Sequence, residues 1–125
     1  MTLDIQEKTT KAELIAAQND RFRKSWGGDV EISGRLMLTA GVAVLPFQAQ
    51  MDVMTAVMTF DTFTEDNDPH GEHDFGAFEI TSEGETHLMF WKIDLYDRAF
   101  YYGSEARDDL IQTRRVLTIM LRSEY

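Results

Sequence analysis

Apolar residues recur at helical spacing in the first part of the chain. Between Ile5 and Trp26, the following side chains fall near a 3.6-residue period: Leu14, Ile15, Ala17, Gln18, Phe22 and Trp26. This periodicity predicts one amphipathic helix. Gly27 and Gly28 follow it, and a glycine just past the last turn commonly ends a helix.

A strand and a second helix are predicted next. The short apolar run Arg35 to Thr39 lies between two glycines, which is typical of a strand. Pro46 suits the first turn of a helix that continues to about Phe60, because its missing N–H costs nothing there. One face of this helix carries Phe47, Met51, Met54, Val57 and Met58. We expect this face to pack in the core, although methionine stripes also form adaptable binding surfaces.

The middle of the chain has the pattern of a loop followed by a hairpin. Asp61 to Gly71 combines turn residues with charge, which predicts a loop. Two strands are expected over residues 75–80 and 87–96, joined by a turn that contains Gly84. The second strand alternates, with Met89, Trp91, Ile93 and Leu95 on one face. Such a wholly apolar face favours a central position in the sheet.

The last part of the chain is predicted to hold a short strand and a final helix. Residues 100–102 fit the strand, and residues 104–109 supply N-cap candidates for a helix with Leu110, Leu117 and Leu121 on one face. The expected fold class is therefore α+β: an antiparallel sheet of three or four strands packed against about three helices in a single domain. We assign residues 1–18 to an N-terminal helical extension and residues 19–125 to the domain.

Composition restricts the function classes. The chain has 125 residues, 22 acidic and 12 basic, and a formal net charge of −10. Residues 61–110 hold 14 of the acids and only three bases. Nucleic-acid binding needs Lys and Arg to neutralise phosphates, so this field predicts a basic protein surface as partner rather than nucleic acid. The absence of cysteine excludes disulfides, thiolate metal sites and a cysteine nucleophile. No long apolar run or leader is evident, so we expect a cytoplasmic protein with no membrane contact.

The segment 66–74 is the densest group of chemically capable side chains. It places His70 and His73 three residues apart, with Glu72 and Asp74 beside them, and these four form a candidate metal site. The spacing lacks the HExxH order that puts two histidines on one helix face. The alternative is structural, with Asn, Asp and Pro turning the chain as it enters a strand. We favour the structural interpretation and expect no metal and no cofactor.

A second charged group combines acids on the predicted second strand with bases of the predicted last helix. We expect Asp94 to pair with Arg114 or Arg115, and Lys92 to lie against Glu72 or Asp74. Such pairs fix strand register without catalysis.

The leading interpretation assigns no catalytic residue. The alternative is acid–base catalysis with His73 as the base, Asp74 or Asp94 as its orienting carboxylate and Arg114 as an anion clamp.

Several longer strings support a resemblance to a known family. NDPHGEHDFG (67–76), FWKIDLYD (90–97) and TRRVLTIMLRSEY (113–125) resemble an uncharacterised proteobacterial family classed as a domain of unknown function, with likeness over about residues 19–125. The family has no accepted activity. The resemblance implies that the protein is the product of an accessory gene of a plasmid or another mobile element. The matching positions are Asn67, Asp68, Pro69, Glu72, His73, Asp74, Phe75, Gly76, Trp91, Lys92, Asp94, Asp97, Thr113, Arg114 and Arg115.

The charge pattern and the resemblance together favour a small, acidic, noncatalytic interaction protein. We expect it to bind a basic protein surface, such as a nucleic-acid-binding or defence complex, and to act as an anti-restriction or anti-CRISPR-like inhibitor. The interaction residues would be acidic side chains of the middle segment: Glu65, Asp66, Asp68, Glu72, Glu83 and Glu85. The alternatives are the enzyme centred on His73, with or without a metal, and a structural or regulatory homodimer.

Overall fold

Helix α2 (Lys11–Lys24) opens the part of the chain that the structure describes. The structure is a computed structural model that describes residues 9–125. Thr10 starts the helix with a capping box: its hydroxyl accepts the Glu13 N–H at 3.1 Å, and its own N–H donates to the Glu13 carboxylate at 2.9 Å. The predicted helix over residues 5–26 is thus confirmed over 11–24, with 9–10 and 25–26 outside it, whereas residues 5–8 lie outside the described residues.

Four strands form one sheet in the order β1-β4-β3-β2: β1 (Gly34–Leu38), β2 (Phe75–Ser82), β3 (Glu85–Tyr96) and β4 (Arg114–Leu121). The β2–β3 hairpin is antiparallel, as expected. Strand β4 pairs antiparallel with β3 and parallel with β1. The sheet is therefore mixed, and the α+β class is confirmed. Strand β3 is central, as its alternating apolar face predicts.

The predicted last helix is wrong, because that segment forms strand β4. Its side chains alternate in burial, with Arg115, Leu117 and Ile119 facing the core, and a period of two is the period of a strand. It pairs with a neighbour on each side, so its backbone groups are satisfied by the ladders. The predicted strand over residues 100–102 is also absent: the chain makes only an isolated bridge between Tyr96 and Gly103.

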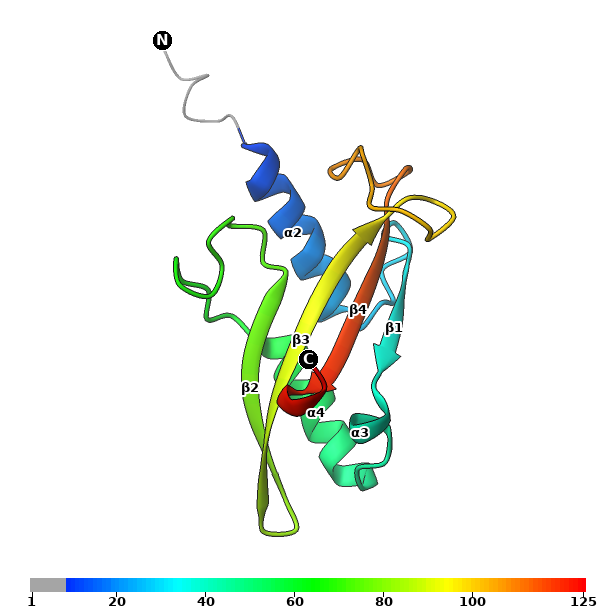
Figure 1. Cartoon of the computed structure of the whole chain (residues 1–125). Helices are drawn as coiled ribbons and strands as arrows, with labels where there is room; N and C mark the ends of the chain where they lie inside the picture. Colours follow the sequence, from blue (N-terminus) through cyan, green and yellow to red (C-terminus); the bar gives the residue numbers. More distant parts are fainter. Residues whose placement is uncertain (1–8) are drawn as a thin grey trace.

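Helices α2 and α4 (Phe47–Thr59) lie on the same side of the sheet, as Figure 1 shows, and the short α3 (Ala40–Ala43) precedes α4. Between the helices and the sheet lies a core that contains Trp91 and Phe22, both fully buried. Helix α4 faces this core with Ala49, Val53 and Val57.

The prediction that the Phe47 and methionine face of α4 packs in the core is therefore largely wrong. Of the five predicted residues only Val57 is buried, whereas Phe47 is 78% exposed and Met51 is 40% exposed. The small residue Ala49 begins the buried stripe instead, so the helix is rotated relative to the prediction.

The opposite face of the sheet carries a small aromatic group. Phe75 and Phe90 lie 5.0 Å apart between ring centroids, and Tyr125 packs on Phe90 at 5.4 Å. Tyr125 reaches them because the 3-10 turn η1 (Arg122–Glu124) folds the end of the chain back after β4. None of the helices in residues 9–125 is long and apolar enough to span a membrane.

Candidate functional site

The connection between α4 and β2 contains a loop, residues 61–72, that we call the acidic loop. It begins with a turn in which the Asn67 side chain accepts the Thr64 N–H and donates to the Thr62 carbonyl, both at 2.8 Å. The Asp68 N–H closes the turn on the Thr64 carbonyl at 2.8 Å. Asn is suited to this position because its short amide can bond to the nearby backbone.

Asp68 holds the second half of the acidic loop. Its carboxylate accepts the N–H groups of Glu72 at 3.1 Å and His73 at 3.2 Å. The side chain is only 4% exposed, so this predicted interaction residue is structural. Its bonds stabilise His73 in a left-handed backbone conformation with φ of 54°, which few residues other than glycine adopt.

Glu72 ties the acidic loop to the loop between β3 and β4. Two nitrogens of Arg107 donate to its two carboxylate oxygens at 2.6 and 2.8 Å, a bidentate pair. These hydrogen bonds lower the pKa of Glu72 and raise the pKa of Arg107. The expected ion pair of Lys92 with Glu72 or Asp74 is not formed, and Lys92 instead lies 3.1 Å from Asp94.

His73 connects the acidic loop to helix α2. Its Nδ1 lies 3.0 Å from each carboxylate oxygen of Asp20, and its Nε2 lies 3.8 Å from Asp68. The imidazole stacks on Phe63, with ring centroids 3.9 Å apart and planes within 3°. The residue is partly exposed, so the ring is held on three sides and open to solvent on another.

Asp20 in turn pairs with the fully buried Arg23. The Arg23 guanidinium donates to Asp20 at 3.0 Å and to the Val57 carbonyl at 2.7 Å, and it lies over the Trp91 ring at 4.9 Å. Burial lowers the pKa of Arg23, while the hydrogen bond to Asp20 opposes that change. The resulting chain of contacts, from Arg23 through Asp20 to His73, holds the acidic loop against the core.

A second buried arginine has neutral partners. Arg115 donates to Asn19 Oδ1 at 2.7 Å and to Gln18 Oε1 at 3.0 Å, and Asn19 also donates to the Glu72 carbonyl at 2.9 Å. Its Nη1 has no hydrogen-bond partner among the described residues. Burial lowers the pKa of Arg115 to about 10. The expected pairing of Asp94 with Arg114 or Arg115 is wrong, since Arg114 bonds to the carbonyls of Ile111 and Thr113.

Asp74 follows the acidic loop at the entry to β2. Burial raises the pKa of its carboxyl, and the neighbouring charges of Glu72 and Asp68 raise it further. Its carbonyl accepts the Ile93 N–H at 2.9 Å. Asp74 is one of the four predicted metal ligands, and its surroundings favour the neutral carboxyl more than solvent does.

The structure does not bring the predicted metal ligands and catalytic residues together in one site. Across residues 9–125, no cluster of three or more His, Cys, Asp or Glu side chains is arranged to hold a metal ion. His70 is exposed, whereas Glu72 and His73 are committed to Arg107 and Asp20. Asp94 and Arg114 point to the sheet face opposite the helices, as their alternation with the buried residues requires, so the structure does not place them at His73.

The acidic interaction candidates also divide. Glu65 and Asp66 are exposed in the acidic loop and make no ion pair within the described part of the chain. Glu83 and Glu85 lie at the tip of the β2–β3 hairpin, at the far end of an eight-residue strand. That strand spans about 25 Å at the usual rise per residue. The six residues therefore do not form one surface.

Sequence reasoning missed the contribution of α2 to this site. Gln18, Asn19 and Arg23 are polar but buried, on the same side of the helix as Ile15 and Phe22. Polar residues within an apolar helical stripe are a usable signal, because buried polar groups need partners elsewhere in the fold.

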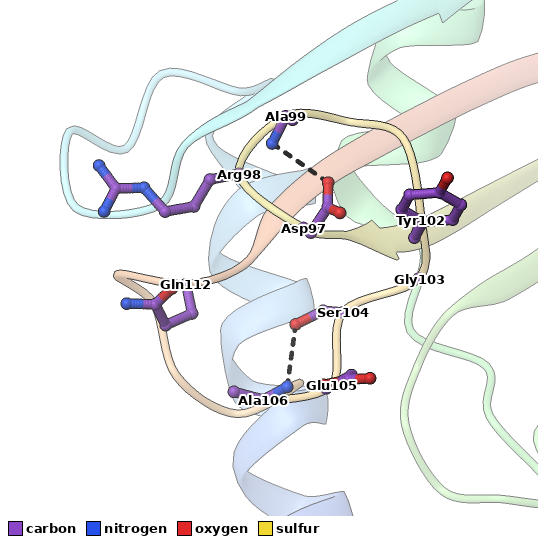
Figure 2. A pocket seen from close by; sticks show the side chains of 9 residues that line it. All are labelled: Asp97, Arg98, Ala99, Tyr102, Gly103, Ser104, Glu105, Ala106 and Gln112. Atoms are coloured by element: carbon purple, nitrogen blue, oxygen red, sulfur yellow. Dashed lines mark hydrogen bonds between the residues drawn. The ribbon is translucent and has the colours of Figure 1, made fainter.

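A hollow of about 630 Å³ lies between the loops that follow β3 and precede β4. Figure 2 shows its lining, in which Asp97 accepts the Ala99 N–H at 3.1 Å and Ser104 accepts the Ala106 N–H at 3.2 Å. These polar groups are used to form the loop turns. His73 does not line this hollow.

Comparison with known proteins identifies a family without a known activity. The family model described as "Protein of unknown function (DUF3768)" matches residues 38–124, which include the acidic loop, Arg107 and strands β2 to β4. Helix α2, with Asp20 and Arg23, precedes the matched segment. No curated protein and no solved structure matches the chain. Because the match covers most of its length, the chain belongs to the DUF3768 family of proteins of unknown function.

Proposed function

We propose that this protein is a noncatalytic interaction domain whose acidic loop binds a basic surface of another protein. The observation that carries the proposal is the division of the loop carboxylates. Asp68 and Glu72 are used within the molecule to fix the loop, while Glu65 and Asp66 are exposed and have no ion-pair partner among residues 9–125.

The rigidity of the acidic loop supports this function. Its backbone is held by Asn67 and Asp68. Its last residue, Glu72, pairs with Arg107, and His73 directly after the loop pairs with Asp20. A binding loop that is already ordered loses less conformational entropy on association. Two exposed carboxylates on such a loop would increase the association rate with a basic partner and favour one orientation.

The partner class follows from charge and from the resemblance. The net charge of −10 disfavours phosphate backbones and favours proteins that themselves bind nucleic acid, because those proteins carry basic surfaces. Among them, the mobile-element context implied by the resemblance favours a nuclease of a restriction or CRISPR-type defence system. The proposal is therefore counter-defence by occupation of such a surface.

An affinity experiment from host lysate tests the proposal. The full chain is immobilised at low salt, and captured proteins are eluted with a salt gradient and identified by mass spectrometry. We expect a basic nucleic-acid-binding protein that elutes with salt, and at least fivefold less of it on a Glu65→Gln, Asp66→Asn double variant. A Glu83→Gln, Glu85→Gln variant is the matched control at the hairpin tip. Equal capture by all three proteins would rule out the acidic loop as the binding site.

A second candidate function, acid–base catalysis, rests on the contact between His73 and Asp20. A carboxylate at Nδ1 fixes the tautomer of a histidine and leaves Nε2 for proton transfer. The partner is Asp20 rather than Asp74 or Asp94. A pH-dependent hydrolytic activity that is lost in both His73→Gln and Asp20→Asn would support catalysis. A substrate screen of the wild type with no activity would remove it.

A further inference from the structure

Helix α4 carries a second apolar stripe on a different face from its buried one. Phe47, Met51, Met54 and Met58 are spaced by four, three and four residues, which places them in one line along the helix. Phe47 is 78% exposed, Met51 is 40% exposed, and Met54 and Met58 are partly exposed. We call these four residues the outer stripe. A contiguous exposed apolar patch is a feature of protein–protein contact surfaces.

The outer stripe lies in a segment with no positive charge. Residues 36–91 contain no Lys or Arg, and the only charged residue of α4 is Asp52. The chain passes directly from Phe60 at the end of α4 into the acidic loop. Apolar contact area is thus joined in the chain to exposed carboxylates. This combination is complementary to a segment that is apolar on one side and basic on the other.

We propose that the outer stripe docks a basic amphipathic helix of the partner protein, whose Lys and Arg residues reach the acidic loop. Methionine side chains are flexible and polarisable, and they adapt to apolar residues of different shape. A helix that lies along a surface presents anchors at positions i, i+3 or i+4, and i+7, which match the spacing of the outer stripe. The proposal rests on the proposed function and specifies its partner.

The 13 residues of α4 set the length of the partner segment. At 1.5 Å per residue, α4 extends for about 20 Å, so a partner helix of about 14 residues covers it. The basic residues must lie on its flanks rather than on the docking side, because Met and Phe leave a buried ammonium group without a partner. An acidic helix would instead be repelled by Asp52 and the acidic loop.

A binding assay with designed peptides tests this proposal. The probe is a fluorescein-labelled helical peptide of about 14 residues, with leucine at i, i+3, i+4 and i+7 and lysine on the flanks. The control peptide replaces every lysine by glutamate. We expect the full chain to bind the basic peptide and not the acidic one. A Phe47→Ala, Met51→Ala variant should bind at least about tenfold more weakly, as for loss of interface anchors.

A matched variant controls for loss of exposed apolar side chains in general. Tyr101 and Ile111 lie in the connection between β3 and β4, where they are 79% and 69% exposed. A Tyr101→Ala, Ile111→Ala variant should therefore bind the basic peptide like the wild type. Circular dichroism melting compares the folding of all variants. Because the substituted side chains are exposed, we expect unchanged melting temperatures.

The outcomes separate this proposal from the proposed function. Equal binding of the basic peptide by the Phe47 and Met51 variant overturns the docking of a helix on the outer stripe. If Glu65→Gln, Asp66→Asn still weakens capture of the partner, the proposed function stands without it. Equal binding of the acidic peptide also overturns the proposal. Sedimentation that finds a dimer of the full chain, dissociated by Phe47→Ala and Met51→Ala, would assign the stripe to a second copy instead.

Discussion

At the scale of single residues, the two buried arginines are stabilised in different ways. Arg23 has a carboxylate partner in Asp20 and an aromatic face in Trp91. Arg115 has amide oxygens, and its charge is not neutralised by an ion pair among the described residues. A buried cation without an anion is costly, so its neutral hydrogen bonds are the contacts that make the position tolerable. The side chain that supplies one of these bonds, Asn19, is therefore a sensitive point of the fold.

We predict that Asn19→Ala lowers the free energy of unfolding by about 3 kcal/mol, because it leaves buried groups without partners. The substitution removes the acceptor of Arg115 Nε and the donor to the Glu72 carbonyl. Urea denaturation followed by circular dichroism gives the value. Gln48→Ala is the matched control, since Gln48 makes an exposed bond to Asp52. A loss below about 1 kcal/mol for Asn19→Ala would contradict this role.

At the scale of elements, a helix or strand is predictable from the sequence where its buried face consists of apolar residues. Local patterns were sufficient for α2 in its described part, for α4 and for the β2–β3 hairpin. The sequence does not predict strand β4, because the alternating buried face of this strand includes Arg115, which counts as polar in any hydrophobic pattern. Leu110, Leu117 and Leu121 then suggested a helical face instead.

The candidate site was predictable only in part for a related reason. The acidic loop is a single segment, so its composition marks it in the sequence. Its partners Asp20 and Arg107 are far from it along the chain, and long-range contacts of this kind have no local sequence signal. The rotation of α4 places the small Ala49 in the buried stripe, which a pattern of large apolar residues does not predict.

Glu72 in the acidic loop and Asp74 directly after it should change the pH dependence of stability in opposite directions. Glu72 has a lowered pKa in the folded state, so its contribution is present above its ordinary value of 4.5 and is lost as the pH falls through the folded value. Asp74 has a raised pKa in the folded state, so stability is lost as the pH rises from its ordinary value of 3.8 through the folded value. Neutralising Glu72 and neutralising Asp74 should therefore change the free energy of unfolding in opposite directions at neutral pH.

We predict that Glu72→Gln destabilises the protein at pH 7 by about 1 kcal/mol, because its bidentate partner is partly exposed. This difference should diminish below pH 4.5, where Glu72 of the unfolded wild type is itself protonated. Asp74→Asn should instead raise the free energy of unfolding relative to the wild type, and by more at pH 7 than at pH 3. Urea midpoints at the two pH values test both. Glu105→Gln, at an exposed position, serves as the control, and a Glu72→Gln effect independent of pH would contradict the prediction.

At the scale of the whole molecule, helix α2 is part of the core although it lies outside the family match. The side covered by α2 and α4 (Figure 1) contains the core and both buried arginines. Helix α2 supplies the partners of Arg115 and His73. Helix α2 is nevertheless outside the segment matched by the DUF3768 family model. The matched segment by itself would lack the apolar cover of Ile15 and Phe22 and the amides that solvate Arg115. The physical unit is therefore larger than the matched segment.

We predict that a chain of residues 28–125 does not fold cooperatively, although it retains the whole family match and all four strands. Without α2, Arg115 loses both amide partners and Asp20 is no longer present to hold His73. Burial of Ile15 and Phe22 is lost as well, at about 2 kcal/mol for each large side chain. Such losses together equal a large part of the 5–15 kcal/mol by which a typical domain is stable.

Thermal melting of the full chain and of residues 28–125, followed by circular dichroism, tests this prediction. The full chain with Ile15→Ala is a milder variant, for which we expect an intermediate stability. A cooperative transition of residues 28–125 at the melting temperature of the full chain would mean that α2 is an accessory to the domain rather than a part of its core.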